Sequence, residues 1–399
     1  TTHAVAASKA GGDQSAARAA AAQAQLTSAV SFSPAGSTSA VPLDAPVSVQ
    51  TALGTIRDIS VQPTTGPALT GAVAQGGQRW VSAGPLAPST TYTISGTVGS
   101  GPTQAPFHST FTTVTPTALV KDALLPNDGT TVGVGQPVVV KFTKNIPAAS
   151  QAAVLSHFTV TETVPVAGGW HWFSSRELHF RPQAFWPTGE QITVASNLDG
   201  WNVGSGMWGT GTDSVHFVVG DSHVAVANLS TERMTVTQNG VVISTYPNSA
   251  GSSQYPTMNG IHIAMDRESV VHMVSSTVGI PVNSPNGYDE MVYNDVHISD
   301  SGEYVHDAPW SVGSQGRHNV SHGCINLSPT DSKAFFDFSR IGDVIEVVGG
   351  PRPPAVGDHG VMDWSTDWSQ YTPGTVTPAT PPPAPAAPAT TATTAPPAG

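Results

Sequence analysis

One cysteine and two histidines stand close together in the last third of the chain. Cys324 is the single cysteine among 399 residues, and it lies in the stretch Ser321-His322-Gly323-Cys324-Ile325-Asn326, which His306 and Asp307 precede. A thiol acts as a nucleophile when a base takes its proton, a third group orients that base and backbone N–H groups face the developing oxyanion. This stretch can meet all three needs, and Gly323 lets the backbone bend tightly before the thiol. The pattern therefore predicts covalent chemistry on Cys324.

Two other interpretations stay open on the residue types alone. His306, His318, His322 and Cys324 are all of metal-ligand type, but no second cysteine, short His-x-His pair or HExxH spacing supports a zinc site. A lone cysteine can also be an inert, buried apolar residue, although the polar neighbours of Cys324 argue against this. We expect no metal and no organic cofactor.

A helix is expected directly after this stretch. Ser328 is its N-cap, Pro329 occupies its first turn, and Asp331 stands three residues after the cap. Gly342 is expected to end it. Because a helix N-terminus carries partial positive charge, we expect this one to lower the pKa of the Cys324 thiol.

Short β-prone runs dominate the remainder of the chain. Between residues 221 and 350 they recur about every ten residues, and a run over Asp343–Val348 closes this part. Earlier, similar layouts follow Pro34 and Pro126 and indicate two tandem all-β sandwiches. The predicted fold class is mainly β.

The chain is expected to divide at changes in composition. The predicted parts are a flexible Ala-rich tether (1–29), two sandwiches (30–116 and 117–220), a catalytic domain (221–350), a packing segment (351–372) and a disordered Pro/Ala/Thr-rich tail (373–399). Trp364, Trp368 and Tyr371 make the packing segment aromatic enough to lie against a domain.

Charge and composition exclude several classes of protein. Fourteen acidic and five basic side chains lie between residues 220 and 349, and no basic stripe is visible, so we expect no nucleic-acid partner. A single cysteine permits no intrachain disulfide. No apolar run of eighteen residues occurs, so we expect no transmembrane helix and no intact signal peptide. The Ser/Thr/Gly-rich first half favours an extracytoplasmic location.

Five of the nine tryptophans fall in the second predicted sandwich. They are Trp170, Trp172, Trp186, Trp201 and Trp208. Indole rings can stack on sugars, but tryptophan is also a large apolar filler with one donor to satisfy. We therefore expect core packing and claim no carbohydrate site.

The stretch around Cys324 resembles the signature of the L,D-transpeptidases of the YkuD family. In that signature a His is followed, after fourteen residues, by Ser/Thr-His-Gly-Cys-x-Asn, which His306 and residues 321–326 match. The resemblance extends through Tyr255-Pro256-Thr257-Met258-Asn259-Gly260, Met273, residues 283–288 and His306-x-Ala-Pro-Trp310. These flanks look most like mycobacterial members, in which two immunoglobulin-like β-sandwiches precede a β-rich YkuD-type catalytic domain.

The resemblance implies an enzyme that cross-links peptidoglycan in the cell envelope. Cys324 would attack the carbonyl of the third residue of a tetrapeptide stem, release the terminal D-Ala and pass the acyl group to a side-chain amine of another stem. The products would be 3-3 cross-links, and His306 would be the base. Stem peptides are thus the implied substrates, and carbapenem β-lactams the implied covalent inhibitors. Any membrane anchor would belong to a segment absent from this chain.

The resemblance also implies roles for the neighbouring residues. The oxyanion would accept hydrogen bonds from His322, Gly323, Cys324 and the Tyr288 hydroxyl. Ser321 and Asn326 would support the loop, and Met273 and Trp310 would line the substrate cleft.

Two positions of this chain differ from those of its relatives. Asp307 follows the base where relatives orient it with a backbone carbonyl, so either its carbonyl or its carboxylate is expected to orient His306. Val278 stands where some relatives have a tyrosine in the flap.

Two alternative functions share most of these features. An L,D-carboxypeptidase would build the same acyl-enzyme and use water as the acceptor. A wall-binding spacer protein would have lost its activity, although the presence of His306, Ser321 and Cys324 argues against that.

Overall fold

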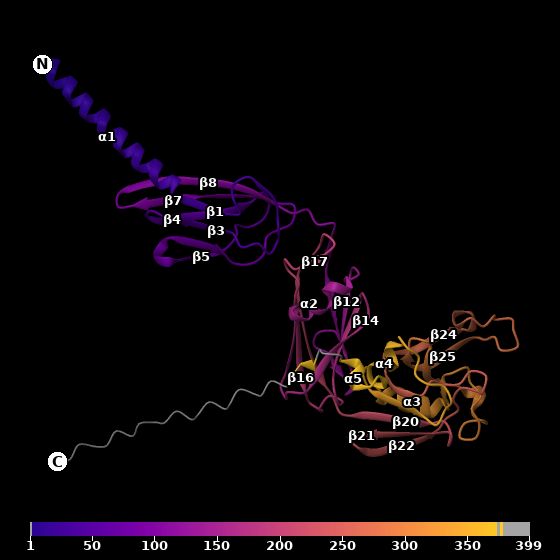
Figure 1. The fold of residues 1–399 in the computed structure, drawn as a ribbon. Coiled ribbons are helices and arrows are strands. Elements are labelled where there is room, and N and C mark those ends of the chain that lie inside the picture. Colours follow the sequence, from indigo (N-terminus) through magenta and orange to yellow (C-terminus); the bar gives the residue numbers. More distant parts are fainter. Residues whose placement is uncertain (1, 373–375, 378–399) are drawn as a thin grey trace, which may run out of the picture. The chain divides into compact units, whose positions relative to one another are not determined.

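A computed structural model describes residues 2–372 and 376–377 of the chain (Figure 1). Contacts between residues divide it into two compact units. The first unit contains the residues up to 122 with 142–157 and 196–212, and the second contains 123–141, 158–195 and the residues from 213 onward. No helix among the described residues is long and apolar enough to cross a membrane.

The chain begins with a helix where the sequence indicated a flexible tether. Helix α1 spans Thr2–Ser28 and is rich in alanine, the residue with the highest helix propensity, which explains its formation without a strong apolar face. Its last turn is anchored, because Leu26 is buried in the core of the first sandwich and Thr27 Oγ1 donates to the Pro106 carbonyl at 3.1 Å. The prediction that residues 1–29 need no fold was therefore wrong.

The first sandwich consists of two four-stranded sheets around one core. One sheet has the order β1-β3-β6-β5 and the other β2-β8-β7-β4. Their bounds are β1 Val30–Ser33, β2 Thr38–Val41, β3 Ser48–Thr51, β4 Thr55–Pro63, β5 Gly71–Ala74, β6 Arg79–Ser82, β7 Thr91–Ser100 and β8 Thr103–Thr113. Apolar residues from both sheets, including Val49, Trp80, Ile94 and Phe111, form a single buried cluster. This layered arrangement is that of a β-sandwich.

The first unit also holds a small three-stranded sheet and a group of short helices. The sheet has the order β17-β18-β9, with bounds Asn202–Gly204, Met207–Gly209 and Ala118–Val120. The helices are η2 (Ala148–Ser150), α2 (Gln151–Val154) and η3 (Leu155–His157).

The second sandwich supplies two further sheets, which lie almost wholly in the second unit. They have the orders β10-β12-β15-β14-β29 and β11-β19-β16-β13. Their bounds are β10 Asp122–Leu125, β11 Thr131–Val132, β12 Val138–Phe142, β13 Phe158–Glu162, β14 Gly168–Ser174, β15 Glu177–Pro182, β16 Gln191–Asn197, β19 Thr212–Val219 and β29 Val376–Thr377. Trp170, Trp186 and Trp208 are buried, and Trp172 and Trp201 are partly buried. The expected core packing is thus confirmed for three of these five tryptophans.

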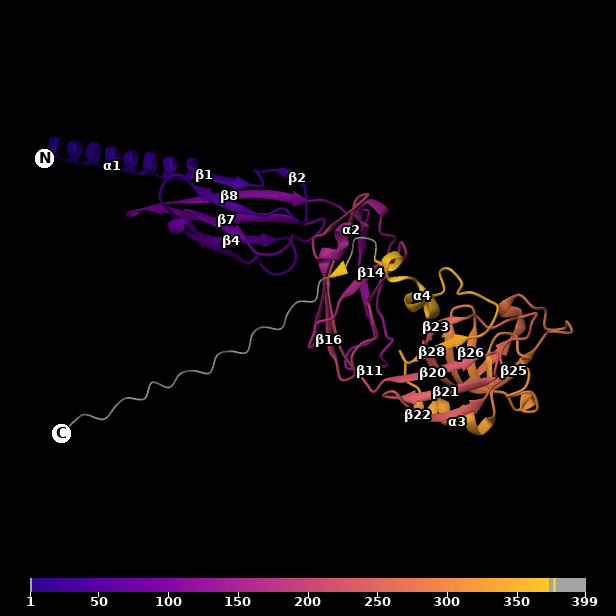
Figure 2. The ribbon, with the colours of Figure 1, turned by 60° about the horizontal axis from the view of Figure 1, so that its bottom comes forward.

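Two sheets form the predicted catalytic domain. One has the order β22-β21-β20-β28-β23, and the other β24-β25-β26-β27; Figure 2 shows β20, β21 and β22 side by side. Their bounds are β20 His223–Asn228, β21 Arg233–Gln238, β22 Val241–Pro247, β23 Gly260–Ile263, β24 Asp266–Val274, β25 Asp289–Ser299, β26 Glu303–Asp307, β27 Ile325–Leu327 and β28 Val344–Val348. Residues of both sheets, such as Ala227, Val305 and Val347, share one core with Phe335 of helix α3.

Helix α3 follows the cysteine at the expected place but is shorter than expected. It spans Pro329–Phe338, and Ser328 caps it by accepting from the Asp331 N–H at 3.1 Å. The backbone turns extended at Ser339, whose hydroxyl donates to the Phe335 carbonyl at 2.7 Å and so satisfies one terminal carbonyl. Gly342 instead occupies the turn before β28, where its φ of 85° suits glycine.

The segment after β28 packs through its aromatic residues. Helix α4 (His359–Ser365) contacts β23. It and α5 (Trp368–Tyr371) present Trp364, Trp368 and Tyr371 to the Arg181 guanidinium, which lies 4.4–4.9 Å from the three ring centroids. The predicted tail over 373–399 lies outside the described residues, apart from Val376 and Thr377, which pair with β14.

Candidate active site

Parallel pairing of β26 with β27 brings the predicted base and nucleophile to the same cleft. His306 pairs with Asn326, and Cys324 directly precedes β27. The cleft has a volume of about 280 Å³. It is lined by Met273, Gly287, Tyr288, Glu290, Val292, His306, Trp310, Val320, Ser321, His322, Cys324 and Asn326.

The His306 imidazole is buried and held in one orientation. Its Nδ1 lies 2.8 Å from the carbonyl oxygen of Asp307, so Nδ1 carries the hydrogen and Nε2 is left as an acceptor. Burial lowers the pKa of His306 to about 4, and the hydrogen bond to Asp307 offsets only part of this effect. The ring is therefore neutral at neutral pH and can take a proton.

The Cys324 thiol is also neutral at rest. Its pKa is raised to about 12, mainly by burial and also by the nearby carboxyls of Glu303 and Asp295, while a hydrogen bond with the Tyr304 backbone opposes this rise. The thiol lies 3.8 Å from the Gly302 carbonyl oxygen. The prediction that the following helix lowers this pKa was wrong. β27 and Ser328 stand between Cys324 and α3 in the chain, and burial outweighs any effect of a helix end, which acts only at close range.

Hydrogen bonds close the loop that carries the cysteine. Ser321 Oγ donates to the Cys324 carbonyl at 2.6 Å and accepts from the Gly323 N–H at 3.1 Å. Thr257 Oγ1 donates to the Gly323 carbonyl at 2.7 Å, and Gly323 has a φ of 131°, which a side chain would rarely allow. Because Ser321 occupies the Gly323 N–H, this amide does not serve as the expected oxyanion donor. The amides of His322 and Cys324 remain candidates.

His322 and Asn326, on either side of the cysteine in the sequence, contact neighbouring segments. The exposed His322 ring lies beside the rings of Tyr255 and Tyr288, with centroid distances of 4.9 and 5.1 Å. Buried Asn326 donates through Nδ2 to Ser311 Oγ at 3.1 Å, which ties the strand after the cysteine to the segment after His306.

Apolar side chains form the walls of the cleft. Trp310 is 56% exposed, and its ring centroid lies 6.1 Å from that of His306. Met273 also lines the cleft. It lies on β24, where it pairs with Glu290 on β25 in the hairpin formed by these strands. Val278 ends helix η4 (Ser275–Val278) in the same hairpin connection and is 45% exposed. Eight of the ten predicted site residues line the cleft. The other two, Asp307 and Gly323, make backbone hydrogen bonds to His306 and Ser321 beside it.

Sequence reasoning assigned no role to three residues that contact the site. Tyr255 and Thr257 lie in a stretch that carried the family resemblance, so their position in the sequence was a signal. No sequence signal pointed to Glu303, because only the fold brings its carboxyl close to Gly323 in the cysteine loop.

The histidines do not assemble a metal site. In the part of the chain that the structure describes, no three His, Cys, Asp or Glu side chains are arranged to hold a metal ion. His318 is absent from the cleft lining, and its carbonyl accepts a hydrogen bond from Ser249 Oγ at 2.7 Å.

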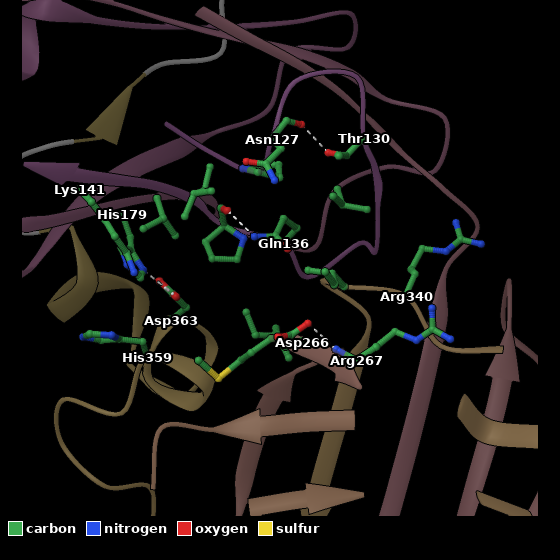
Figure 3. Close-up of a pocket in the computed structure, with 18 of the residues that line it drawn as sticks. Asn127, Thr130, Gln136, Lys141, His179, Asp266, Arg267, Arg340, His359 and Asp363 are labelled. Carbon is green, nitrogen blue, oxygen red and sulfur yellow. Dashed lines mark hydrogen bonds and ion pairs between the residues drawn. The ribbon is translucent and has the colours of Figure 1, made fainter. Parts of the chain in front are cut away.

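A larger cavity of about 590 Å³ elsewhere in the second unit contains none of the predicted catalytic residues (Figure 3). Its lining includes buried His179, whose Nδ1 lies 2.9 Å from Asp363 and whose Nε2 lies 3.1 Å from Glu177. Burial opposes protonation of His179, but the two carboxylates outweigh it and raise the pKa of His179 to about 9. This cluster is a structural ion-pair network rather than a nucleophile–base pair.

The fold and the cleft define the class of protein, because two β-sandwiches precede a β-rich domain with cysteine and histidine in one cleft. Residues 222–347 match the L,D-transpeptidase catalytic domain family, YkuD, and residues 38–202 match the bacterial Ig domain family. The chain belongs to the L,D-transpeptidase family and is an L,D-transpeptidase. The predicted family resemblance and fold class are confirmed.

Three relatives illustrate the match. The chain is 40% identical to L,D-transpeptidase 2 of Mycobacterium tuberculosis over 337 residues, which cover 84% of this chain and 81% of that protein. It is 32% identical to L,D-transpeptidase 5 of the same organism, over 88% of this chain and 77% of that protein. The structure of the L,D-transpeptidase LdtMt1 in complex with imipenem is 38% identical, with a TM-score of 0.52, and covers 57% of this chain and 98% of that chain.

Proposed function

We propose that this enzyme forms 3-3 cross-links between peptidoglycan stems through an acyl-enzyme on Cys324. One observation carries the proposal: a neutral imidazole with Nδ1 fixed by a carbonyl shares a cleft with the chain's lone thiol. A neutral base can accept the thiol proton as the bond to substrate forms.

In the acylation step, Cys324 Sγ attacks the carbonyl carbon of the third residue of a tetrapeptide stem. The thiol proton moves to His306 Nε2, and the carbonyl electron pair moves to oxygen, which faces the amides of His322 and Cys324. The oxyanion then re-forms the carbonyl, the bond to the terminal D-Ala nitrogen breaks, and the imidazolium returns the proton to that nitrogen.

In the transfer step, a side-chain amine of a second stem attacks the thioester carbonyl. His306 takes a proton from the attacking nitrogen, the C–S bond breaks, and the thiolate recovers the proton. The net exchange is one amide for another, so no oxidant, reductant or cofactor is needed.

The same proposal places the enzyme outside the cytoplasm, in the cell envelope, where peptidoglycan stems are found. It also makes carbapenems covalent inhibitors, since the strained β-lactam carbonyl would acylate the same sulfur. The imipenem complex of LdtMt1 supports this part of the proposal.

Mass spectrometry of the intact protein tests acylation and the fate of the acyl group together. We expect a carbapenem adduct and a transient stem adduct on the wild type, neither on Cys324→Ser, and cross-linked product only when an amine acceptor is present. Release of free tripeptide at the same rate with and without acceptor would identify an L,D-carboxypeptidase. A wild type that forms no adduct would indicate an inactive spacer.

A further inference from the structure

A buried carboxyl that the proposed reaction does not use lies directly against the cysteine loop. Glu303 is the first residue of β26 and is 3% exposed. A Cβ atom placed on Gly323 would lie 3.4 Å from Glu303 Oε1 and 3.5 Å from its Cγ. The carboxyl therefore lies close to the face of Gly323 that would carry the side chain in any other residue.

Hydrogen bonds to Oε1 fix this carboxyl. The Met258 N–H donates to it at 3.1 Å, and Arg352 Nη1 donates at 2.7 Å. Thr257, the residue before Met258, donates to the Gly323 carbonyl. Residues 257 and 258 thus hold the loop and the carboxyl beside it in a common arrangement.

Arg352 is itself anchored to the same segment. It forms an isolated bridge with Met258, and its carbonyl accepts from the Asn259 N–H at 2.8 Å. Its guanidinium also reaches the Pro256 carbonyl at 3.4 Å. The cation is therefore placed by backbone contacts as well as by its ion pair.

The charge of Glu303 acts on the thiol. The pKa of Glu303 is raised to about 7, mainly by burial and also by Asp358, while Arg352 and the Met258 N–H oppose this rise. When ionised, Glu303 opposes ionisation of Cys324, as does Asp295. Of the groups that face Glu303, Arg352 is the cation that offsets this opposition.

We propose that the Glu303–Arg352 pair is a positioning device for the reaction at Cys324. The Glu303 carboxyl supports the loop at Gly323, and Arg352 neutralises the carboxylate so that it does not disfavour negative charge on the sulfur and the oxyanion. This inference rests on the proposed role of Cys324 as nucleophile.

Removal of the Arg352 cation alone should leave the Glu303 carboxylate without a compensating charge. We expect Arg352→Gln to slow single-turnover acylation by a carbapenem about tenfold at pH 9, which is about 1.4 kcal/mol of barrier. The deficit should shrink toward pH 6, because Glu303 without its cation binds a proton there and becomes neutral. The double variant Glu303→Gln/Arg352→Gln should recover to within about threefold of wild type, because no buried charge is left.

Two further variants keep the result interpretable. Arg352→Lys retains the charge and should keep the wild-type pH profile, and Lys333→Gln removes one cation from an exposed pair of the same domain and should change nothing. A folded Arg352→Gln variant with wild-type rates, a pH-independent loss, or a double variant as slow as Arg352→Gln would overturn the proposal. If Arg352→Gln does not fold, Arg352→Lys serves as the test, and a shifted pH profile of its acylation rate would overturn the proposal. A wild type that forms no adduct would instead overturn the proposed function.

Discussion

The backbone carbonyl of Asp307 accepts the hydrogen bond from His306 Nδ1, at 2.8 Å. The carboxylate of the same residue does not take this place, and its Oδ1 has no hydrogen-bond partner among the described residues. A carbonyl fixes the tautomer of the ring without adding a negative charge that would stabilise imidazolium. The imidazole is therefore oriented but only weakly basic, in line with its low pKa.

Asp307→Asn should change the acylation rate by less than about tenfold, because the substitution leaves the carbonyl in place. Rates measured from pH 6 to 9 for Asp307→Asn and Asp307→Ser check this prediction. A loss of about a hundredfold in both variants would show that the carboxylate orients the base.

Cys324→Ser should abolish acylation without unfolding the protein. A hydroxyl is far less acidic and less nucleophilic than a thiol, and serine fits the space of cysteine. Intact-mass analysis and thermal unfolding measure the two properties separately. Wild-type acylation by this variant would contradict the assignment of the nucleophile.

The pH dependence of acylation should follow the lowered pKa of His306. Because the free enzyme needs neutral imidazole, kcat/KM should fall as the pH drops through about 4, and not near the ordinary histidine value of 6.5. His306→Gln should lower the rate by about 10²–10⁴ and remove this limb. Loss of activity through an apparent pKa near 6.5 would show that the ring is more solvated than the structure indicates.

Ser321→Ala should weaken the cysteine loop. The variant leaves the buried Gly323 N–H without its acceptor and frees the Cys324 carbonyl, which costs about 1–3 kcal/mol of stability. We expect acylation to slow while the affinity for substrate changes little. Ser314→Ala, outside the cleft lining, is a matched control for loss of a hydroxyl.

Protonated His179 should stabilise the second unit in a defined pH window. Its pKa is about 9 in the folded protein against 6.5 for a free histidine, so the contribution is complete below pH 6.5 and is lost as the pH rises through 9. Denaturant unfolding at pH 6, 8 and 10 should show this loss in wild type and a smaller one in Asp363→Asn. The exposed Asp337→Asn should behave as wild type.

The sequence predicted which residues lie together around Cys324 better than it predicted their pKa values. The spacing of His306 and residues 321–326 identified residues of the cleft, because their types are chemically restrictive. The parallel pairing of β26 with β27, which brings them together, is seen only in the fold. The pKa of the thiol depends on burial, which no local pattern reports, so the expected helix effect was wrong. The role of Ser321 as acceptor for Gly323 likewise depends on a φ of 131° that only the folded loop has.

Contacts distant in sequence were the least predictable. Glu303 and Arg352 are 49 residues apart and carry no motif, yet β28 and the segment after it bring them together at 2.7 Å. Helix α1 was not predicted from the sequence for a local reason. The Ala-rich stretch was interpreted as a tether because it lacks an apolar face, although alanine has a high intrinsic helix propensity.

A thiol with a pKa of about 12 is also chemically durable. At neutral pH its thiolate fraction is on the order of 10⁻⁵, and thiolate is the form that peroxides and alkylating agents attack. The chain has no second cysteine that could rescue an oxidised sulfur as a disulfide. Keeping the thiol protonated at rest therefore protects the sulfur on which the proposed reaction depends.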